Sequence, residues 1–174
     1  WLLAIIWKHL QTSLDLVSSL MIWLQQTAKL FSKYNLEIKW TSPMGFPVVQ
    51  DYRYFQKYRV KTSIAGSLVY TTLRKQMIKK DSLKNQSAIS ANLTHSLDAA
   101  LAMGVALYCK HDAQPIPNLL MVHDSFATTP NRIDQLHYII RKVAVDIFKE
   151  DYLGKLYENF KNQLPDEAKD QLAK

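Results

Sequence analysis

One segment, Leu119–Thr128, limits what this chain can fold into more than any other, because a histidine and a carboxylate interrupt an apolar, strand-like run. The four apolar residues 119–122 are typical of a buried strand. His123 and Asp124 follow where the chain should turn, and residues 125–128 can return as a second strand. The pattern predicts a β-hairpin whose turn presents the Asp124 carboxylate rigidly to a metal ion. An ordinary hairpin with a turn aspartate shows the same pattern.

The composition indicates a globular protein. The chain has 174 residues, of which 48% are apolar and 21% are charged, enough for one domain with a core or for a piece of something larger. The single cysteine, Cys109, excludes an internal disulfide and a cysteine-based zinc site, and indicates a reducing compartment. The apolar start, Trp1–Trp7, is too short to span a membrane and lacks the features of a signal peptide. We therefore expect a protein that is not secreted and is cut at its N-terminus.

Positive charge is concentrated in the first half of the chain. Residues 1–80 hold twelve Lys or Arg and three acids, whereas residues 81–174 hold ten and twelve. Between Arg53 and Lys80 there are eight basic residues and no acid, interleaved with tyrosine and phenylalanine. Basic side chains neutralise phosphates and aromatic rings stack on bases, so the segment is a candidate nucleic-acid surface. A solvated basic face is the alternative.

The basic segment also has strand character. Residues from Val48 to about Arg74 are rich in Val, Tyr, Thr and Ile, and Gly66 lies near the middle, which predicts a long hairpin turning there. Alternation along a strand would place Arg59 and Lys61 on one face. Residues 76–86 are polar and basic, and we expect a mobile connection.

Helical patterns fill most of the remaining chain. Thr12 or Ser13 can cap a helix that runs to about Lys33, and Asn92 can cap one that begins near Leu93. Two further amphipathic helices are expected over 132–149 and 151–164. Within residues 41–48, Pro43, Gly45 and Pro47 impose a defined turn.

Three ordered blocks are shared with a known family. Trp40–Tyr52 is similar to a Trp-x-Thr/Ser-Pro-x-Gly-x-Pro-Val segment, Asn92–Asp98 to an Asn-x-x-His-Ser-x-Asp element, and His123–Phe126 to the His-Asp-Ser-Phe of motif C. Leu156–Phe160 also fits the family's C-terminal helices. On these motifs the chain resembles the C-terminal portion of a bacteriophage-type, single-subunit DNA-directed RNA polymerase, covering about the last fifth of such an enzyme.

The resemblance implies an α+β fold, mostly helical, in which a polymerase palm fragment carries the motif C β-hairpin and a second long basic β-hairpin. It implies three segments. Residues 1–47 would be a helix and connecting turn of the fingers and palm region, residues 48–80 a basic specificity-type hairpin with its connection, and residues 81–174 the C-terminal part of the palm.

The resemblance also implies roles at the motif C turn. Asp124 would be a catalytic ligand of Mg²⁺, and His123 would lie beside the primer end or triphosphate or make a structural hydrogen bond. The motif A aspartate would lie N-terminal to Trp1, so we expect the fragment alone to be inactive.

Nucleic-acid contacts are implied elsewhere. His95, with Asn92 and Ser96, would contact the minor-groove edge of the nascent base pair, where the acceptor pattern is degenerate. Arg59 and Lys61 fall where the family's promoter-recognition hairpin faces DNA.

The implied function is templated nucleotidyl transfer from ribonucleoside triphosphates by a two-metal mechanism. The implied partners are a DNA template and promoter, nascent RNA and the remainder of the polymerase chain N-terminal to Trp1, with no membrane. The expected location is a mitochondrion or the cytoplasm of a phage-bearing or plasmid-bearing host.

Two other readings fit the same residues. A family A DNA polymerase palm fragment shares the Val-His-Asp motif, but that family places Glu after the aspartate, where this chain has Ser125. A non-catalytic nucleic-acid-binding module would use the hairpin for structure only. Binding of a metal ion would distinguish the two polymerase hypotheses from the non-catalytic module. A preference for ribonucleotides over deoxyribonucleotides would distinguish the RNA polymerase from the DNA polymerase.

Overall fold

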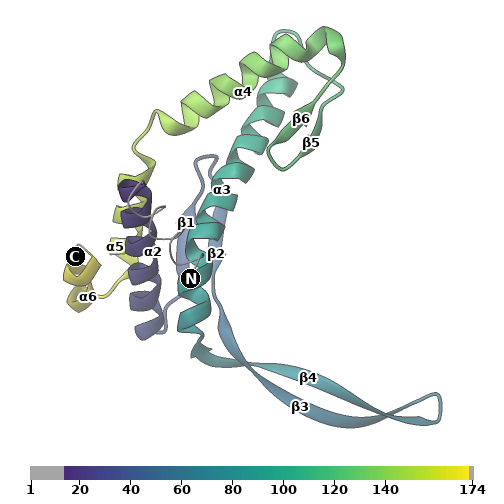
Figure 1. The fold of residues 1–174 in the computed structure, drawn as a ribbon, viewed down its shortest axis with the longest axis vertical. Coiled ribbons are helices and arrows are strands. Elements are labelled where there is room, and N and C mark those ends of the chain that lie inside the picture. The colour runs from purple at the N-terminus through teal and green to yellow at the C-terminus, as the bar shows by residue number, and fades with distance from the viewer. Residues whose placement is uncertain (1–13, 173–174) are drawn as a thin grey trace, which may run out of the picture. The chain divides into compact units, whose positions relative to one another are not determined.

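The structure, a computed structural model, describes residues 14–172 as an α+β fold, as the sequence predicts. Figure 1 shows the helices together with three separate two-stranded sheets, β1-β2, β3-β4 and β5-β6. The elements in chain order are α2 (Asp15–Lys33), β1 (Ile38–Thr41), β2 (Pro47–Gln50), β3 (Arg53–Ile64), β4 (Ser67–Lys80), α3 (Ser82–His111), β5 (Leu120–Val122), β6 (Ser125–Ala127), the 3-10 turn η1 (Pro130–Arg132), α4 (Ile133–Phe148), α5 (Tyr152–Gln163) and α6 (Asp166–Leu172).

The chain divides into two compact units. Among the described residues, one unit comprises residues 14–38 and 50–89, and the other comprises residues 39–49 and 90–172. The division into segments 1–47, 48–80 and 81–174 stays a prediction. No helix within residues 14–172 is long and apolar enough to cross a membrane.

In the first unit, α2 ends where the sequence predicts. Its last residue is Lys33, and Asn35 adopts a left-handed conformation with φ of 55°. The proposed caps Thr12 and Ser13 lie outside the described residues.

The long hairpin is formed by β3 and β4, paired antiparallel from Arg53 and Lys80 to Ile64 and Ser67. Ala65 and Gly66 make the turn with φ of 51° and 82°. Positive φ at both central residues matches the right-handed twist of the strands, and glycine adopts it without strain. The predicted turn at Gly66 is confirmed. β4 extends to Lys80, so the mobile connection predicted over 76–86 is wrong.

Helix α3 begins eleven residues earlier than predicted, at Ser82, and Asn92 lies within it rather than capping it. Asp81 supplies the cap, because its carboxylate accepts a hydrogen bond from the backbone N–H of Lys84 at 3.1 Å. Asn85 is buried and donates to the carbonyl oxygen of Tyr52 at 3.1 Å, while its own carbonyl oxygen accepts from the Gln50 amide at 2.9 Å. These bonds join the base of the hairpin to the first turns of α3.

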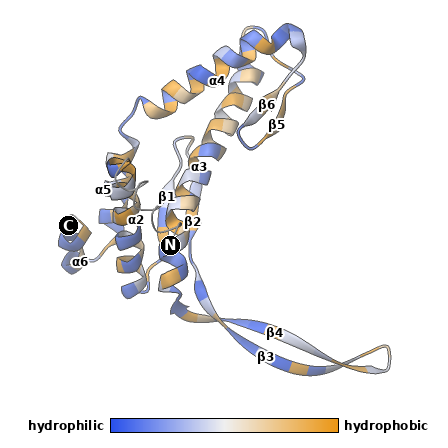
Figure 2. Ribbon diagram, viewed as in Figure 1, coloured by the Kyte–Doolittle hydropathy of each residue, from blue (hydrophilic) through white to orange (hydrophobic). Residues whose placement is uncertain are grey.

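The core of the second unit lies where α3 and α4 bury one face each. Hydrophobic and hydrophilic positions alternate along α4 (Figure 2), and α4 buries Leu136, Ile139, Val143 and Ile147. The α3 side of this core is formed by Ala100, Val105 and Cys109, with Ile116 from the loop that follows. The helices predicted over 132–149 and 151–164 are confirmed as α4 and α5, within a residue or two of their bounds.

Candidate metal-binding turn and nucleic-acid surfaces

The hairpin predicted from the opening motif is present. β5 and β6 pair antiparallel with Val122 opposite Ser125, so His123 and Asp124 form a two-residue turn. His123 has φ of 53°, a value that a tight hairpin turn requires of its first residue. Leu119 and Phe126 pack against the core of the second unit, which fixes the hairpin to its support.

The strand leading into this turn is not buried, contrary to the prediction. Leu120 and Val122 are 66% and 61% exposed. A three-residue strand in a two-stranded sheet has few neighbours to cover it, and in this hairpin Leu119 and Phe126 make the contacts with the core. The apolar run therefore contributes one anchor residue and an exposed strand.

Asp124 and His123 are both exposed at the turn. Among residues 14–172, Asp124 forms no ion pair or hydrogen bond, so its carboxylate oxygens are open to a ligand. No group of three His, Cys, Asp or Glu residues in that range is arranged to hold a metal ion. Asp124 is thus a single available carboxylate.

The second motif block lies on α3, and its residues have different surroundings. His95 is exposed and Asn92 is half-buried. Ser96 is only 8% exposed: its Oγ accepts a hydrogen bond from Trp40 Nε1 at 3.1 Å and donates to the Leu93 carbonyl oxygen at 2.7 Å. Ser96 therefore joins this block to Trp40 at the start of the first one, and His95 is the member open to solvent.

The first motif block forms the tight connection between β1 and β2. The backbone N–H of Gly45 donates to the Ser42 carbonyl oxygen at 2.8 Å, and the N–H of Phe46 donates to Ser42 Oγ at 3.1 Å. Gly45 has φ of 83°, where a side chain would be strained. The defined turn predicted from the prolines and glycine is confirmed.

The β3–β4 hairpin is a two-faced ribbon. Arg59 and Lys61 share one face, as predicted, and the Arg59 guanidinium lies 4.7 Å from the centroid of the Tyr70 ring. The register adds two cations to this face, because Lys57 lies directly opposite Arg74. In the described part of the chain none of these four cations forms an ion pair with an acid. The sequence pattern missed Lys57 and Arg74 as partners, since register cannot be read from composition.

The other face of the ribbon carries several apolar side chains together with Lys75. Tyr58 lies opposite Leu73, and Val60 and Val69 follow toward the turn. All four side chains are at least 37% exposed. The four cations therefore form a distinct surface of the ribbon. We call this surface, made of Lys57, Arg59, Lys61 and Arg74, the cationic face.

Comparison with known proteins covers the whole chain. The family model described as DNA-dependent RNA polymerase matches residues 1–174. The chain is 34% identical over 148 residues to DNA-directed RNA polymerase 1, mitochondrial, of Nicotiana sylvestris, which covers 85% of this chain. It is 33% identical over 132 residues to DNA-directed RNA polymerase 1A of Nicotiana tabacum, which covers 76% of this chain and 81% of that protein.

These relatives differ in length. The match covers 14% of the mitochondrial polymerase of Nicotiana sylvestris and 42% of DNA-directed RNA polymerase 2A of Nicotiana tabacum, so the chain spans only part of the longer relatives. The family assignment rests on the match along the entire chain and on the three motif blocks, two of which the structure joins through Trp40 and Ser96. The chain belongs to the DNA-dependent RNA polymerase family.

Proposed function

We propose that this chain works as the C-terminal palm and specificity-hairpin portion of a DNA-directed RNA polymerase that transfers nucleotides from ribonucleoside triphosphates onto RNA along a DNA template. The observation that supports this most directly is the Asp124 carboxylate, which lies at a two-residue turn and forms no hydrogen bond or ion pair with residues 14–172. The family match and the names of the relatives support the same reaction. They do not favour the family A DNA polymerase reading or the non-catalytic module.

The chemistry of Asp124 fits a magnesium ion. Mg²⁺ prefers carboxylate oxygen and is usually bound through one or two carboxylates together with substrate phosphates. An exposed aspartate on a tight turn meets that need, because the hairpin limits its movement while its oxygens stay open. When bound, the ion supplies Lewis-acid stabilisation of the charge that develops during phosphoryl transfer. A second carboxylate would come from the remainder of the polymerase chain, which the longer relatives contain.

The other motif residues would position the reactants. His123, exposed beside Asp124, would donate a hydrogen bond to the triphosphate or the primer end. His95, exposed on α3, would contact the minor-groove edge of the nascent base pair, with Asn92 beside it on the helix. Ser96 would act through Trp40, holding the β1–β2 connection against α3.

The cationic face of the ribbon would contact the promoter. A Lys and an Arg directly opposite each other repel in the free protein, and a phosphate between them removes that repulsion. Arg59 is held over the Tyr70 ring, so its planar group is oriented before DNA arrives. Since relatives are named mitochondrial or chloroplastic polymerases, we place the enzyme in an organelle, and the cytoplasm of a phage-bearing or plasmid-bearing host is the alternative.

The test is Asp124→Asn in an intact polymerase that contains this segment. The amide keeps the shape of the carboxylate but not the charge, so nucleotide addition should fall by more than a hundredfold while promoter binding stays within about twofold. Asp112→Asn is the matched control, because Asp112 also follows a histidine but lies in the loop after α3. If Asp124→Asn kept its activity within about tenfold of the parent enzyme, the activation free energy would have risen by no more than ~1.4 kcal/mol, and the proposed metal role would be overturned.

A further inference from the structure

The end of the β3–β4 ribbon that carries the turn is uncharged and aliphatic. Residues 62–69, which we call the tip, contain no charged side chain, whereas the rest of β3 and β4 contains eight Lys or Arg. In Figure 1 the tip lies at the end of the ribbon opposite to the end that continues into α3. Ile64 and Leu68, on either side of the Ala65–Gly66 turn, are 61% and 66% exposed. The ribbon therefore holds two large aliphatic side chains in water at this end.

These two side chains lie on opposite faces of the ribbon. Leu68 is opposite Ser63, and Ile64 is opposite Ser67. Because side chains alternate between faces along a strand, Leu68 lies on the cationic face and Ile64 lies on the other. Alanine and glycine, the residues of the turn, add little bulk between them. The tip is therefore narrow at its leading edge and aliphatic on both faces.

The cation next to the tip indicates which partner these side chains meet. Lys61 lies on the same face as Leu68 and two residues before Ser63, the residue opposite Leu68. That separation is roughly 7 Å along the strand, at about 3.3 Å for each residue. Two base steps of DNA span about the same length, since each step rises about 3.4 Å. A phosphate bound by Lys61 would therefore lie within about two base steps of Leu68.

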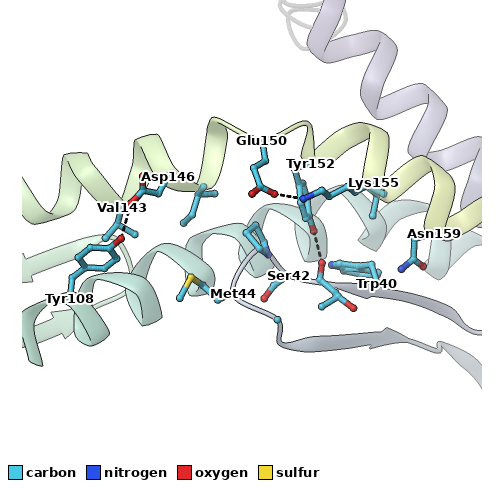
Figure 3. Close-up of a pocket in the computed structure, with 15 residues that line it drawn as sticks. Trp40, Ser42, Met44, Tyr108, Val143, Asp146, Glu150, Tyr152, Lys155 and Asn159 are labelled. Carbon is cyan, nitrogen blue, oxygen red and sulfur yellow. Dashed lines mark hydrogen bonds and ion pairs between the residues drawn. The ribbon is translucent and has the colours of Figure 1, made fainter. Parts of the chain in front are cut away.

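The charges of the ribbon differ in one respect from those around a cavity of the second unit, where the charged groups already have partners. Figure 3 shows the Tyr108 hydroxyl donating to Asp146 and the Lys155 ammonium paired with Glu150. The four cations of the cationic face, in contrast, form no ion pair with an acid of residues 14–172. No acid occurs within residues 53–80, so the ribbon suits a polyanion. The base stack is the part of DNA that offers apolar surface to the tip.

We propose that the tip is a wedge that enters the base stack of promoter DNA, with Leu68 against one base pair and Ile64 against the next. Aliphatic side chains inserted in this way unstack a base step, and the separated bases meet apolar surface on both faces of the tip. The cationic face holds the DNA backbone while the tip opens the step. The inference rests on the proposed function, because the cationic face must first bring the ribbon to DNA.

Promoter DNA that carries 2-aminopurine tests the wedge in an intact polymerase containing this segment. The fluorescence of this base rises when it leaves the stack, and the base is placed at successive positions in separate duplexes without nucleoside triphosphates. The parent enzyme should raise the fluorescence at one or two neighbouring positions. Leu68→Ser and Ile64→Ser should each lower that rise about threefold or more, whereas Leu68→Met, which keeps an apolar side chain, should leave it near the parent value. An unchanged rise in both serine variants would overturn the proposal.

Ile78→Ser is the matched control. Ile78 is 78% exposed on β4, close to the base of the ribbon, so the substitution removes an exposed aliphatic side chain away from the tip. It should leave the fluorescence rise unchanged. If it lowers the rise as much as Leu68→Ser does, the tip has no special part in opening DNA and the proposal fails. Leu68→Ala takes the place of Leu68→Ser should the serine variant not fold, because alanine also shortens the wedge.

A promoter that is already open at the responding step separates DNA opening from other effects. On a template mismatched at that step, Leu68→Ser should bind and initiate within about twofold of the parent enzyme, because the bases no longer need to be unstacked. A defect of equal size on the mismatched template and on the duplex would show that the tip contacts something other than the base stack, and would overturn the proposal. If the parent enzyme neither binds the promoter nor adds ribonucleotides, the proposed function itself has failed. If it does both and the tip variants open the duplex normally, only the wedge has failed.

Discussion

The Lys80 ammonium is paired with the Asp51 carboxylate at the base of the long hairpin, and the Lys80 side chain is only 2% exposed. Arg53 holds the other oxygen of the same carboxylate at 2.7 Å and reaches Glu37 at 3.4 Å. A buried ammonium is tolerated only when an acid neutralises it. The pair therefore fixes the first residue of β3 and the last residue of β4 at the base of the hairpin.

Asp51→Asn should lower the free energy of unfolding by about 3 kcal/mol, because it leaves Lys80 buried without a carboxylate. Urea unfolding at pH 7 measures this. Asp170→Asn, which removes an exposed acid on α6, should change the free energy of unfolding by less than about 0.5 kcal/mol and serves as the control. If the two substitutions lowered the free energy of unfolding equally, the buried pair of Lys80 and Asp51 would stabilise the fold no more than an exposed acid does.

The same pair makes stability depend on acid pH. Burial acts to raise the pKa of Asp51, but the hydrogen bonds and charges of Lys80 and Arg53 outweigh it and lower that pKa below its ordinary value of 3.8. When the pKa of a carboxyl group is lower in the folded state than in the unfolded state, the ionised group stabilises the fold at every pH above its ordinary pKa. This stabilisation is lost as the pH falls from the ordinary pKa through the lowered pKa of the folded state. The difference in stability between the parent chain and Asp51→Asn should therefore be constant near neutrality and shrink below about pH 3.8. A difference that shrinks near pH 6 would point to another group.

Gly104→Ala should destabilise the second unit by about 1–3 kcal/mol, because a Cβ there would lie 2.5 Å from Val143 Cγ1. Without that contact, alanine would stabilise the middle of a helix by about 1 kcal/mol relative to glycine, so the sign of the change is diagnostic. Adding Val143→Ala to Gly104→Ala should cost less than the sum of the two single substitutions in thermal unfolding. A rise in stability from Gly104→Ala alone would show that α3 and α4 do not approach closely at this point.

Ser96→Ala should act on stability, since it removes the acceptor of the buried Trp40 indole N–H and costs about 1–3 kcal/mol. His95→Ala, at an exposed position one residue away, should leave stability unchanged and instead reduce discrimination against mispaired nucleotides in an intact polymerase. The two readouts are chemical unfolding of the chain and misincorporation by the enzyme. If Ser96→Ala in the Trp40→Phe background costs as much as it does alone, the hydrogen bond is not the source of its effect.

Local signals in the sequence were enough for the hairpin turns and for the later helices. Gly66 marks a turn because glycine adopts positive φ without strain, and the His123–Asp124 pair marks one because it interrupts an apolar run. The structure has a turn at each. The period of apolar residues after Pro130 gives α4 within about a residue of its bounds. These features depend on neighbours along the chain.

Features that depend on distant residues were missed. The polar composition of residues 76–86 predicts a mobile connection, yet α3 already begins at Ser82, and Asn85 is held by the backbone of Tyr52, 33 positions earlier. The apolar run before His123 was expected to be buried, but burial depends on what packs over a strand, and Leu120 and Val122 stay exposed. At the candidate site, the Asp124 turn was predictable, whereas the Lys57–Arg74 pair required the strand register.

The cationic face gives the last prediction. Because Lys57 and Arg74 repel across the ribbon, Lys57→Ala should leave the stability of the chain unchanged or raise it by up to about 1 kcal/mol. It should nevertheless weaken promoter binding by an intact polymerase on all sequences and lower the salt slope of binding by about one unit. We expect Lys61→Ala to behave in the same way. Arg59→Ala should instead relax the preference at one promoter position, at a cost of about 1–3 kcal/mol for the preferred base.

Lys75→Ala is the matched control for these substitutions, because Lys75 lies opposite Gln56 on the other face of the ribbon and loses the same charge. Its salt slope should stay close to that of the parent enzyme, since only residues that touch phosphates release counterions. Binding is measured on a set of base-substituted promoters at several salt concentrations. If Lys75→Ala lowers the salt slope of promoter binding as much as Lys57→Ala does, the ribbon attracts DNA by its overall charge, and DNA does not bind to the cationic face in particular. Losing a phosphate contact reduces the number of counterions released on binding and must therefore change the salt slope. If no substitution changes the promoter affinity, the salt slope or the base preference, the cationic face does not contact DNA and is a solvated surface.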